Sequence, residues 1–247
     1  MLNPSEADVR FLCDRRQGIG ADGLLRAVKA DRVPEWTGPG GLWFMDYRNC
    51  DGSIAEMCGN GLRVFVHWLL EEGLVDGDVI DIATRAGLRR ARVTRDGRIC
   101  VYMGVPHWDE KPTTIHLGDR EFTGHAVDVG NPHCVIRLTT PQELVALDLR
   151  SPIQSDLAAG INVEFVVDLG ENRLRMRVQE RGVGETPSCG KGVVAACCDA
   201  QQRHSSPTYR VEVPGGRLKV DFTEDGEALL TGPAIIVARG EVTLPDD

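Results

Sequence analysis

Aromatic residues are scarce in this 247-residue sequence, where Trp, Tyr and Phe together make up only 5%. Glycine is plentiful instead, with 28 residues. A core of smaller apolar side chains, connected by many tight turns, favours a strand-rich protein. The length suits one large domain or two small ones, and it allows a sizeable core without disulfide or metal support.

Basic residues are not in excess either, since the formal net charge is −9. No run rich in Lys and Arg is present, which argues against a nucleic-acid-binding surface. No stretch approaches the roughly 18 consecutive apolar residues of a membrane span. The first ten residues, MLNPSEADVR, lack the basic start and apolar core of a signal peptide. We therefore expect a cytoplasmic protein with neither nucleic-acid nor membrane partners.

The eight cysteines form no C-x-x-C pair and no Cys/His spacing typical of zinc sites. We therefore expect free thiols and no metal. The segment GKG (190–192) looks like part of a phosphate-binding loop, but the spacing of such a loop fails. It would need a glycine where Glu185 stands, and Ser or Thr where Gly192 stands. No dinucleotide-binding fingerprint is present.

Runs of apolar and β-branched residues, separated by turn-forming pairs such as Asp96-Gly97, predict strands joined mostly by hairpins. The sheets should therefore be largely antiparallel. Strands are expected at 42–47, 79–84, 89–94, 99–104, 113–117, 125–130, 134–138, 162–169, 173–180, 209–213, 217–222 and 228–232. Helical periodicity predicts helices at 4–13, 60–72, 141–147 and 190–203.

The organisation is doubled, because each half combines several hairpins with one apolar helix. Each of these two helices follows a Cys-Gly-x-Gly motif, EMCGNGLRVF at 56–65 and PSCGKGVVAA at 187–196. The stretch GVPHWDEKP at 104–112 is the most linker-like. The expected fold is α+β, with two similar domains at 1–110 and 111–233.

A cysteine at the start of a helix lies near unpaired amides and the positive end of the helix dipole. That setting can lower a thiol pKa from about 8.5 to roughly 3.5–7.5. The glycines allow a bound anion to approach the backbone closely. Two such turns facing each other would place a base and an acid on opposite sides of a carbon, as inversion of a stereocentre requires. The remaining cysteines are interpreted as small buried apolar residues.

Several segments resemble the signature blocks of the diaminopimelate epimerase family, in the form found in actinobacteria. They are LCDRRQGIGADGLL (12–25), RNCDGSIAEMCGNGLRVF (48–65), VDVGNPHCVI (127–136), INVEFV (161–166), ERGVGETPSCGKG (180–192) and VPGGRLKV (213–220). The resemblance covers nearly the whole chain, in order. It implies two similar domains, each a mostly antiparallel sheet wrapped around a central helix, with the site in the cleft between them. It also implies that the C-terminal segment, 234–247 here, returns to the first domain, with a strand at 235–244.

The resemblance also implies the site. Cys58 and Cys189 would be the thiol–thiolate pair that converts LL-2,6-diaminopimelate to the meso form, with His133 and Glu180 assisting. The substrate-binding positions carried over are Asn49, Gly59, Asn60, Asn131, Asn162, Glu180, Arg181, Gly190 and Lys191. Asn49 precedes the turn-forming pair Asp51-Gly52, so a purely structural role as a turn former is the alternative for this residue. The family uses no pyridoxal phosphate, so no cofactor is expected. A homodimer is one oligomeric state that the sequence allows.

The sequence departs from the family pattern in two respects. The family normally opens with a strand and a G-x-x-N-D-F-like turn, and the lack of these roughly twenty residues would leave a strand edge open. We therefore expect weak activity or poor solubility from this chain. Lys191 stands where the family usually has Thr or Ser, and it either points to solvent or changes a carboxylate contact. Two alternatives remain: a racemase of another amino acid or peptide residue, and an inactive paralogue that acts as a binding module.

Overall fold

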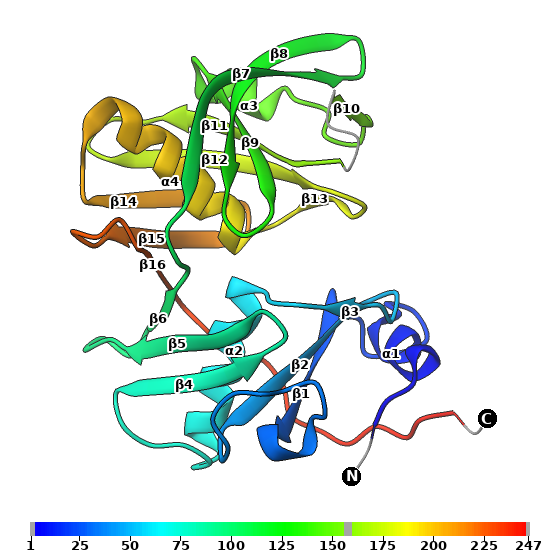
Figure 1. Cartoon of the computed structure of the whole chain (residues 1–247). Helices are drawn as coiled ribbons and strands as arrows, with labels where there is room; N and C mark the ends of the chain where they lie inside the picture. Colours follow the sequence, from blue (N-terminus) through cyan, green and yellow to red (C-terminus); the bar gives the residue numbers. More distant parts are fainter. Residues whose placement is uncertain (1–2, 156–159, 246–247) are drawn as a thin grey trace. The chain divides into compact units, whose positions relative to one another are not determined.

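The computed structural model describes residues 3–155 and 160–245. The chain forms two compact units (Figure 1). Unit 1 contains Met1–Val101 and Pro233–Asp247, and unit 2 contains Tyr102–Gly232. Most residues of both units lie in strands and turns, with few helices, as expected for an α+β protein.

Unit 1 is built on a sheet of strand order β1-β2-β4-β5-β6, with the short strand β3 paired to β2. The pair β2·β4 is parallel, and β1·β2, β4·β5 and β5·β6 are antiparallel. Its elements are α1 (Glu6–Cys13), β1 (Gly23–Lys29), the 3₁₀ helix η1 (Ala30–Arg32), β2 (Trp43–Asn49), β3 (Ile54–Ala55), α2 (Gly59–Glu71), β4 (Val79–Thr84), β5 (Gly87–Val93) and β6 (Ile99–Tyr102).

Helix α2 is amphipathic, and its apolar face packs on β1 and β2. Its fully buried side chains recur with helical spacing at Leu62, Phe65, Val66 and Leu69. The helix ends where Gly73 takes a positive φ of 63°, which a glycine adopts without the cost of a Cβ. The predicted helix at 60–72 is confirmed.

Unit 2 is a larger sheet of strand order β16-β15-β14-β12-β11-β9-β8-β7-β10, with β13 paired to β12. The pairs β9·β11 and β12·β14 are parallel, and the remaining pairs are antiparallel. Its elements are β7 (His107–Leu117), β8 (Arg120–Asp128), β9 (Pro132–Leu138), α3 (Pro141–Val145), β10 (Ile153–Ser155), β11 (Asn162–Asp168), β12 (Arg173–Glu180), β13 (Gly184–Thr186), α4 (Gly190–His204), β14 (Thr208–Val213), β15 (Gly216–Phe222) and β16 (Ala228–Gly232).

Helix α4 is the centre of unit 2 (Figure 1). It contacts strands β7, β8, β9, β11, β12, β15 and β16, so the sheet curves around it. Its residues from Gly192 through Ala200 are all buried, which explains why they are mostly Gly, Val, Ala and Cys. Small side chains allow strands to approach a helix closely on several sides. The predicted helix at 190–203 is confirmed, including its position inside a closely surrounding sheet.

The linker predicted at 104–112 is wrong, because most of this stretch belongs to strand β7. Between Trp108 and Pro112 the pairing with β8 is irregular, which accommodates the charged and proline-containing sequence. The indole nitrogen of Trp108 donates a hydrogen bond to Asp199 in α4 at 3.2 Å. The division of the chain falls between Val101 and Tyr102, whereas the sequence places the boundary after residue 110.

The C-terminal segment belongs to unit 1, although residues 233–245 form no strand. The carbonyl of Pro233 accepts a hydrogen bond from Nε of Arg63 in α2 at 3.5 Å. Farther along, Arg239 pairs with Glu71 and Glu72 at the end of the same helix. The segment therefore follows α2 as an extended chain, and the predicted strand at 235–244 is not formed.

Candidate active site

The first Cys-Gly-x-Gly motif forms the start of α2. Cys58 is the N-cap residue, with an extended backbone (φ −134°), and Gly59 and Asn60 begin the first turn. The Cys58 sulfur accepts a hydrogen bond from the amide of Gly61 at 3.4 Å. At a helix N-cap, a side-chain oxygen of Ser, Thr, Asp or Asn usually accepts the hydrogen bond from such an amide. Here the Cys58 sulfur takes the place of that oxygen. The predicted location of Cys58 at a helix start is confirmed.

A buried cation lies one turn below Cys58. Arg63 is 5% exposed, and its guanidinium donates to the Gly59 carbonyl at 3.4 Å and to the Asn60 side-chain oxygen at 3.0 Å. Burial lowers the pKa of Arg63 to about 10, while the nearby Cys58 acts in the opposite direction. Arg63 is therefore still charged at neutral pH. Arg63 was not among the residues predicted from the sequence. Its signal was a charged residue within the apolar run LRVF, since arginine is rarely buried unless it is paired.

Asn49 lies at the end of β2, in the turn that leads toward the Cys58 motif. Its side-chain nitrogen donates to the Ser53 hydroxyl at 3.0 Å, and its amide bonds to the Ser53 carbonyl at 2.9 Å. These bonds account for Asn49 as a turn-forming residue. A role in binding substrate stays a prediction.

The second motif forms the start of α4 in the same way. Cys189 is the N-cap residue, again with an extended backbone (φ −114°), and Gly190 begins the helix. Gly192 takes the position that Gly61 takes in the first motif. A Cβ at Gly192 would lie only 2.4 Å from the Glu164 carboxylate, so this glycine permits a buried carboxylate beside the turn.

The electrostatic setting of Cys189 differs from the one that its helix position predicts. Burial raises the pKa of this thiol well above its usual value, and the negative charges of Glu180 and Glu164 raise it further. The amide of Gly192 opposes them but is outweighed. At Cys189, burial and two nearby carboxylates therefore outweigh the lowering of the pKa that a helix start can produce.

His133 and Glu164 form a buried pair on the neighbouring parallel strands β9 and β11. Both side chains are 0% exposed, and Nδ1 of His133 lies 2.7 Å from Oε1 of Glu164. On its other side, Nε2 of His133 lies 3.2 Å from the Asn131 side-chain oxygen. The second Glu164 oxygen is buried without a hydrogen-bond partner. Glu164 was not among the residues predicted from the sequence, where its signal was a single carboxylate in the apolar run NVEFVV.

Asn162, Glu180 and Arg181 are held near the same ends of β11 and β12. The Asn162 side chain donates to the Pro132 carbonyl at 3.2 Å and accepts from the Arg181 amide at 3.0 Å. Glu180 accepts a hydrogen bond from the Thr186 hydroxyl at 2.5 Å. Unit 2 thus brings together most of the predicted site residues of its half of the sequence.

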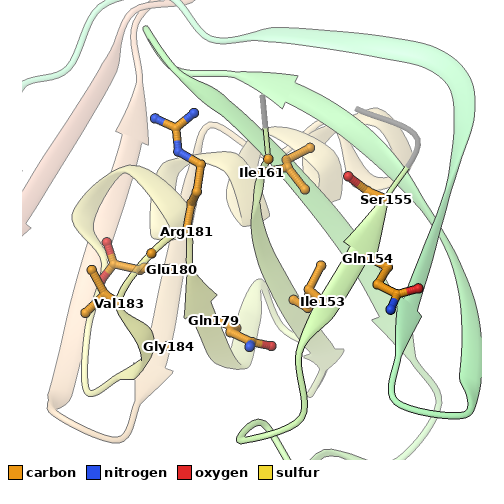
Figure 2. Close-up of a pocket in the computed structure, with 11 residues that line it drawn as sticks. Ile153, Gln154, Ser155, Ile161, Gln179, Glu180, Arg181, Val183 and Gly184 are labelled. Atoms are coloured by element: carbon orange, nitrogen blue, oxygen red, sulfur yellow. The ribbon is translucent and has the colours of Figure 1, made fainter. Parts of the chain in front are cut away.

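Glu180 and Arg181 also line a pocket of about 570 Å³ within unit 2 (Figure 2). The other lining residues are Ile153, Gln154, Ser155, Gly160, Ile161, Gln179, Gly182, Val183 and Gly184. Figure 2 shows the Arg181 side chain extending at one end of the pocket and Gln179 at the other. The pocket offers an arginine fork and a carboxylate to a polar ligand, which suits a molecule that carries both amino and carboxylate groups.

Lys191, the departure from the family pattern, is partly buried at the first turn of α4. Its Nζ lies 3.8 Å from where a Cβ on Gly130 would be. The side chain therefore reaches the β8–β9 turn that contains Asn131, rather than solvent alone. An ammonium at this position can contact a carboxylate bound at the α4 turn.

Neither a metal cluster nor a membrane helix is found in the part of the chain that the structure describes. No group of three or more His, Cys, Asp or Glu side chains there could hold a metal ion. No helix there is long and apolar enough to cross a membrane.

Comparison with known proteins adds the family. The sequence model described as "Diaminopimelate epimerase" matches residues 2–108 and 125–243, which is most of the chain. The chain belongs to the diaminopimelate epimerase family. It is 47% identical over 243 residues to the diaminopimelate epimerase of Corynebacterium glutamicum, covering 94% of this chain and 87% of that protein. The enzyme of Streptomyces coelicolor is 43% identical over 254 residues, covering 97% and 87%. The resemblance to the actinobacterial form is confirmed.

Solved structures extend the comparison to the fold of this epimerase family member. A phenazine biosynthesis protein of the PhzF family from Enterococcus faecalis matches with a TM-score of 0.67 at 14% identity, covering 99% of this chain and 90% of that one. A hydroxyproline epimerase from Agrobacterium vitis matches with a TM-score of 0.62 at 16% identity, covering 91% and 77%. At these identities the likeness concerns the fold alone, and it confirms the predicted α+β fold class.

Proposed function

We propose that the protein converts LL-2,6-diaminopimelate to meso-diaminopimelate, with Cys58 and Cys189 as the acid–base pair. The observation that carries the proposal is the repeated turn. Each cysteine is the N-cap of the central helix of its unit, followed by glycines at matching positions. A single such turn would suit a structural thiol, but two matched ones suit a reaction that needs an acid and a base.

The reaction moves one proton off the α-carbon and another onto its opposite face. A thiolate takes the α-proton, and the electron pair of the broken C–H bond spreads into the adjacent carboxylate. The other thiol then gives its proton to the carbon. Because an α-proton is very weakly acidic, the developing negative charge needs stabilisation, which the backbone amides of a helix N-terminus supply.

The remaining site residues would bind and orient the substrate. Arg181 would clamp a carboxylate with its planar fork, and Glu180 would bind an ammonium group. His133 would orient Asn131 at the β8–β9 turn through the 3.2 Å contact. Substrate contacts from Asn49 and Asn162, and amide contacts from Gly59, Asn60 and Gly190, complete the proposed set.

The test is deuterium uptake at the α-carbon of LL-diaminopimelate in heavy water, followed by mass spectrometry and NMR. We expect the wild-type protein to produce meso product carrying deuterium at the inverted centre. Cys58→Ala and Cys189→Ala should each lower product formation by at least about 10³-fold, because each removes one proton-transfer group. Cys50 is exposed, so its interpretation as a buried residue was wrong, and Cys50→Ala is the matched control that should keep wild-type activity.

Full activity in either alanine variant would refute the two-thiol proposal. Absence of exchange with any form of the protein would favour the inactive binding module.

Lys191 motivates a second candidate, an epimerase or racemase of another amino acid. Exchange with a different amino acid, but none with diaminopimelate, would favour that candidate. We also propose that the enzyme acts in the cytoplasm on a small amino-acid substrate. A homodimer is the proposed oligomeric state, which light scattering would test.

A further inference from the structure

The two cysteine turns have the same backbone form but opposite buried charges beneath them. Under Cys58 lies the Arg63 guanidinium, 5% exposed and bonded to the Gly59 carbonyl and the Asn60 side chain. Under Cys189 lies the Glu164 carboxylate, 0% exposed, which a Cβ at Gly192 would touch. Motif and helix position are shared, whereas the buried charges beneath the two turns are opposite in sign.

We propose that this asymmetry fixes the resting proton: Cys58 is the thiolate and Cys189 the thiol in the free protein. The proposal rests on the proposed function only in treating these cysteines as the acid–base pair. A buried positive charge beside Cys58 stabilises its anion, since charges interact strongly where water is excluded. Buried carboxylates beside Cys189 destabilise its anion for the same reason. Glu164 and Arg63 are therefore positioning residues that act through the thiols.

The charges that face Cys189 come from several elements, and negative ones prevail. Glu164 on β11 and Glu180 at the end of β12 both raise the pKa of this thiol. Nδ1 of His133 on β9 lies 2.7 Å from one Glu164 oxygen, and the second Glu164 oxygen is buried without a hydrogen-bond partner. The Lys191 ammonium lies near the β8–β9 turn, with Nζ 3.8 Å from where a Cβ on Gly130 would be.

The effect of Glu164 extends to a second thiol on the other side of the carboxylate. Cys134 is buried in β9, and its pKa is raised to about 12 by burial and by the charge of Glu164. Glu164 is therefore a source of negative charge felt on both sides of β11.

The assignment gives the catalytic cycle a direction. In the first turnover, Cys58 forms an S–H bond with the α-proton, while the S–H bond of Cys189 breaks as its proton bonds to the opposite face of the carbon. Cys58 is then a thiol and Cys189 a thiolate, the state that the buried charges disfavour. After product release, loss of the Cys58 proton to water and uptake of a proton by Cys189 restore the resting form.

The test is the rate of alkylation by iodoacetamide, in which a thiolate forms a carbon–sulfur bond as iodide leaves. Peptide mapping with fragmentation follows Cys58 and Cys189 separately in the full-length protein from pH 5 to 10. We expect Cys58 to react at least tenfold faster than Cys189 at pH 7. We also expect the Cys58 rate to reach its half-maximum at a lower pH. The pH of the half-maximum reports ionisation, whereas the maximal rate also reports access.

Substitutions of Glu164 and Arg63 then test whether these buried charges cause the difference in ionisation between Cys189 and Cys58. Glu164→Gln should raise the Cys189 rate at pH 7 severalfold and move its half-maximum to lower pH, while Glu121→Gln, an exposed carboxylate on β8, should change neither. Arg63→Gln should lower the Cys58 rate, and Arg63→Lys should restore it. The wild-type profiles decide the matter even where a buried-charge variant fails to fold.

A lower half-maximum for Cys189 than for Cys58 would overturn the assignment, as would equal half-maxima. An unchanged Cys189 profile in folded Glu164→Gln would overturn the role of Glu164. Alkylation needs no turnover, so its outcome is separate from that of the epimerisation assay. Reversed ionisation in an active enzyme would refute this inference and leave the two-thiol function standing.

Discussion

Gly192 and Gly61 occupy matching positions in the two cysteine turns but face different neighbours. A Cβ at Gly192 would lie 2.4 Å from a Glu164 oxygen that is fully buried and held by His133. A Cβ at Gly61 would meet the Leu25 side chain at 3.3 Å and the Cys58 Cβ at 3.4 Å. The first contact requires the buried, hydrogen-bonded Glu164–His133 pair to move, whereas the second requires a small shift of a flexible leucine.

We therefore expect Gly192→Ala to lower the free energy of unfolding by about 1–3 kcal/mol, through forced displacement of a packed group. Gly61→Ala should change it by less than about 1 kcal/mol, because the helix preference for alanine offsets the tighter contact. Urea unfolding of the two variants measures the difference. Equal stabilities would show that Glu164 moves aside freely.

Lys191 is the residue at which the substrate preference of this chain can differ from that of its relatives. We expect Lys191→Thr to raise KM for diaminopimelate about tenfold, equivalent to about 1.4 kcal/mol, with kcat little changed, if the ammonium binds a substrate carboxylate. Steady-state kinetics measures both constants. Lys219→Thr on β15 is the control, since Lys219 pairs with Asp221. An unchanged KM in Lys191→Thr would mean that Lys191 does not bind the substrate.

At the scale of elements, Asp199 ties helix α4 to two strands. Its carboxylate pairs with Arg137 of β9 at 2.5 Å and accepts from the indole of Trp108 in β7 at 3.2 Å. Asp199 is 1% exposed, so its charge depends on these partners. We expect Asp199→Asn to lower the free energy of unfolding by about 2–3 kcal/mol, somewhat less than for a fully buried pair because Arg137 is partly exposed.

The control for this prediction is Asp221→Asn. Its partner Lys219 lies at 2.8 Å, and both side chains are partly exposed, so the loss should stay below about 1 kcal/mol. Thermal unfolding followed by circular dichroism measures both variants. A similar effect of the two substitutions would show that the Asp199 pair contributes no more than a surface pair.

The sequence could predict elements whose signals lie within them, but not elements whose conformation depends on distant contacts. Helices α2 and α4 followed from periodicity and the motifs before them, since these signals lie within the elements themselves. The stretch at 104–112 was predicted as a linker from its prolines and charges. Its strand conformation depends on pairing with β8 and on the contact between Trp108 and Asp199, which local sequence does not reveal. Strands β10 (Ile153–Ser155) and β13 (Gly184–Thr186) are too short for any period to be read.

The site shows the same division between local and distant information. The positions of Cys58 and Cys189 at helix starts followed from their motifs and are confirmed. Arg63 and Glu164 were missed, because their importance depends on which face of an element points toward a thiol. A charged residue in an apolar run was the signal available. The raised pKa of Cys189 could not be predicted from its motif, because it depends on burial and on carboxylates from other strands.

At the scale of the whole molecule, the last residues of the chain complete unit 1. We expect a chain that ends at Gly232 to lose amide protection in α2 while α4 keeps it, because Arg63 loses its Pro233 acceptor. Loss of a hydrogen bond to a buried charged group costs about 1–3 kcal/mol. Hydrogen exchange with mass spectrometry resolves the two helices. A chain ending at Gly240, which keeps Pro233 and Arg239, is the control, and equal protection in both chains would contradict the expectation.

The path of the chain also has a consequence during synthesis. Unit 2 is inserted between the first 101 residues of unit 1 and its closing segment. A ribosome that adds about 5–20 residues per second therefore releases all of unit 2 before unit 1 can finish, a delay on the order of ten seconds. The half of the protein translated first is completed last, and the first cysteine turn depends on that completion through Arg63.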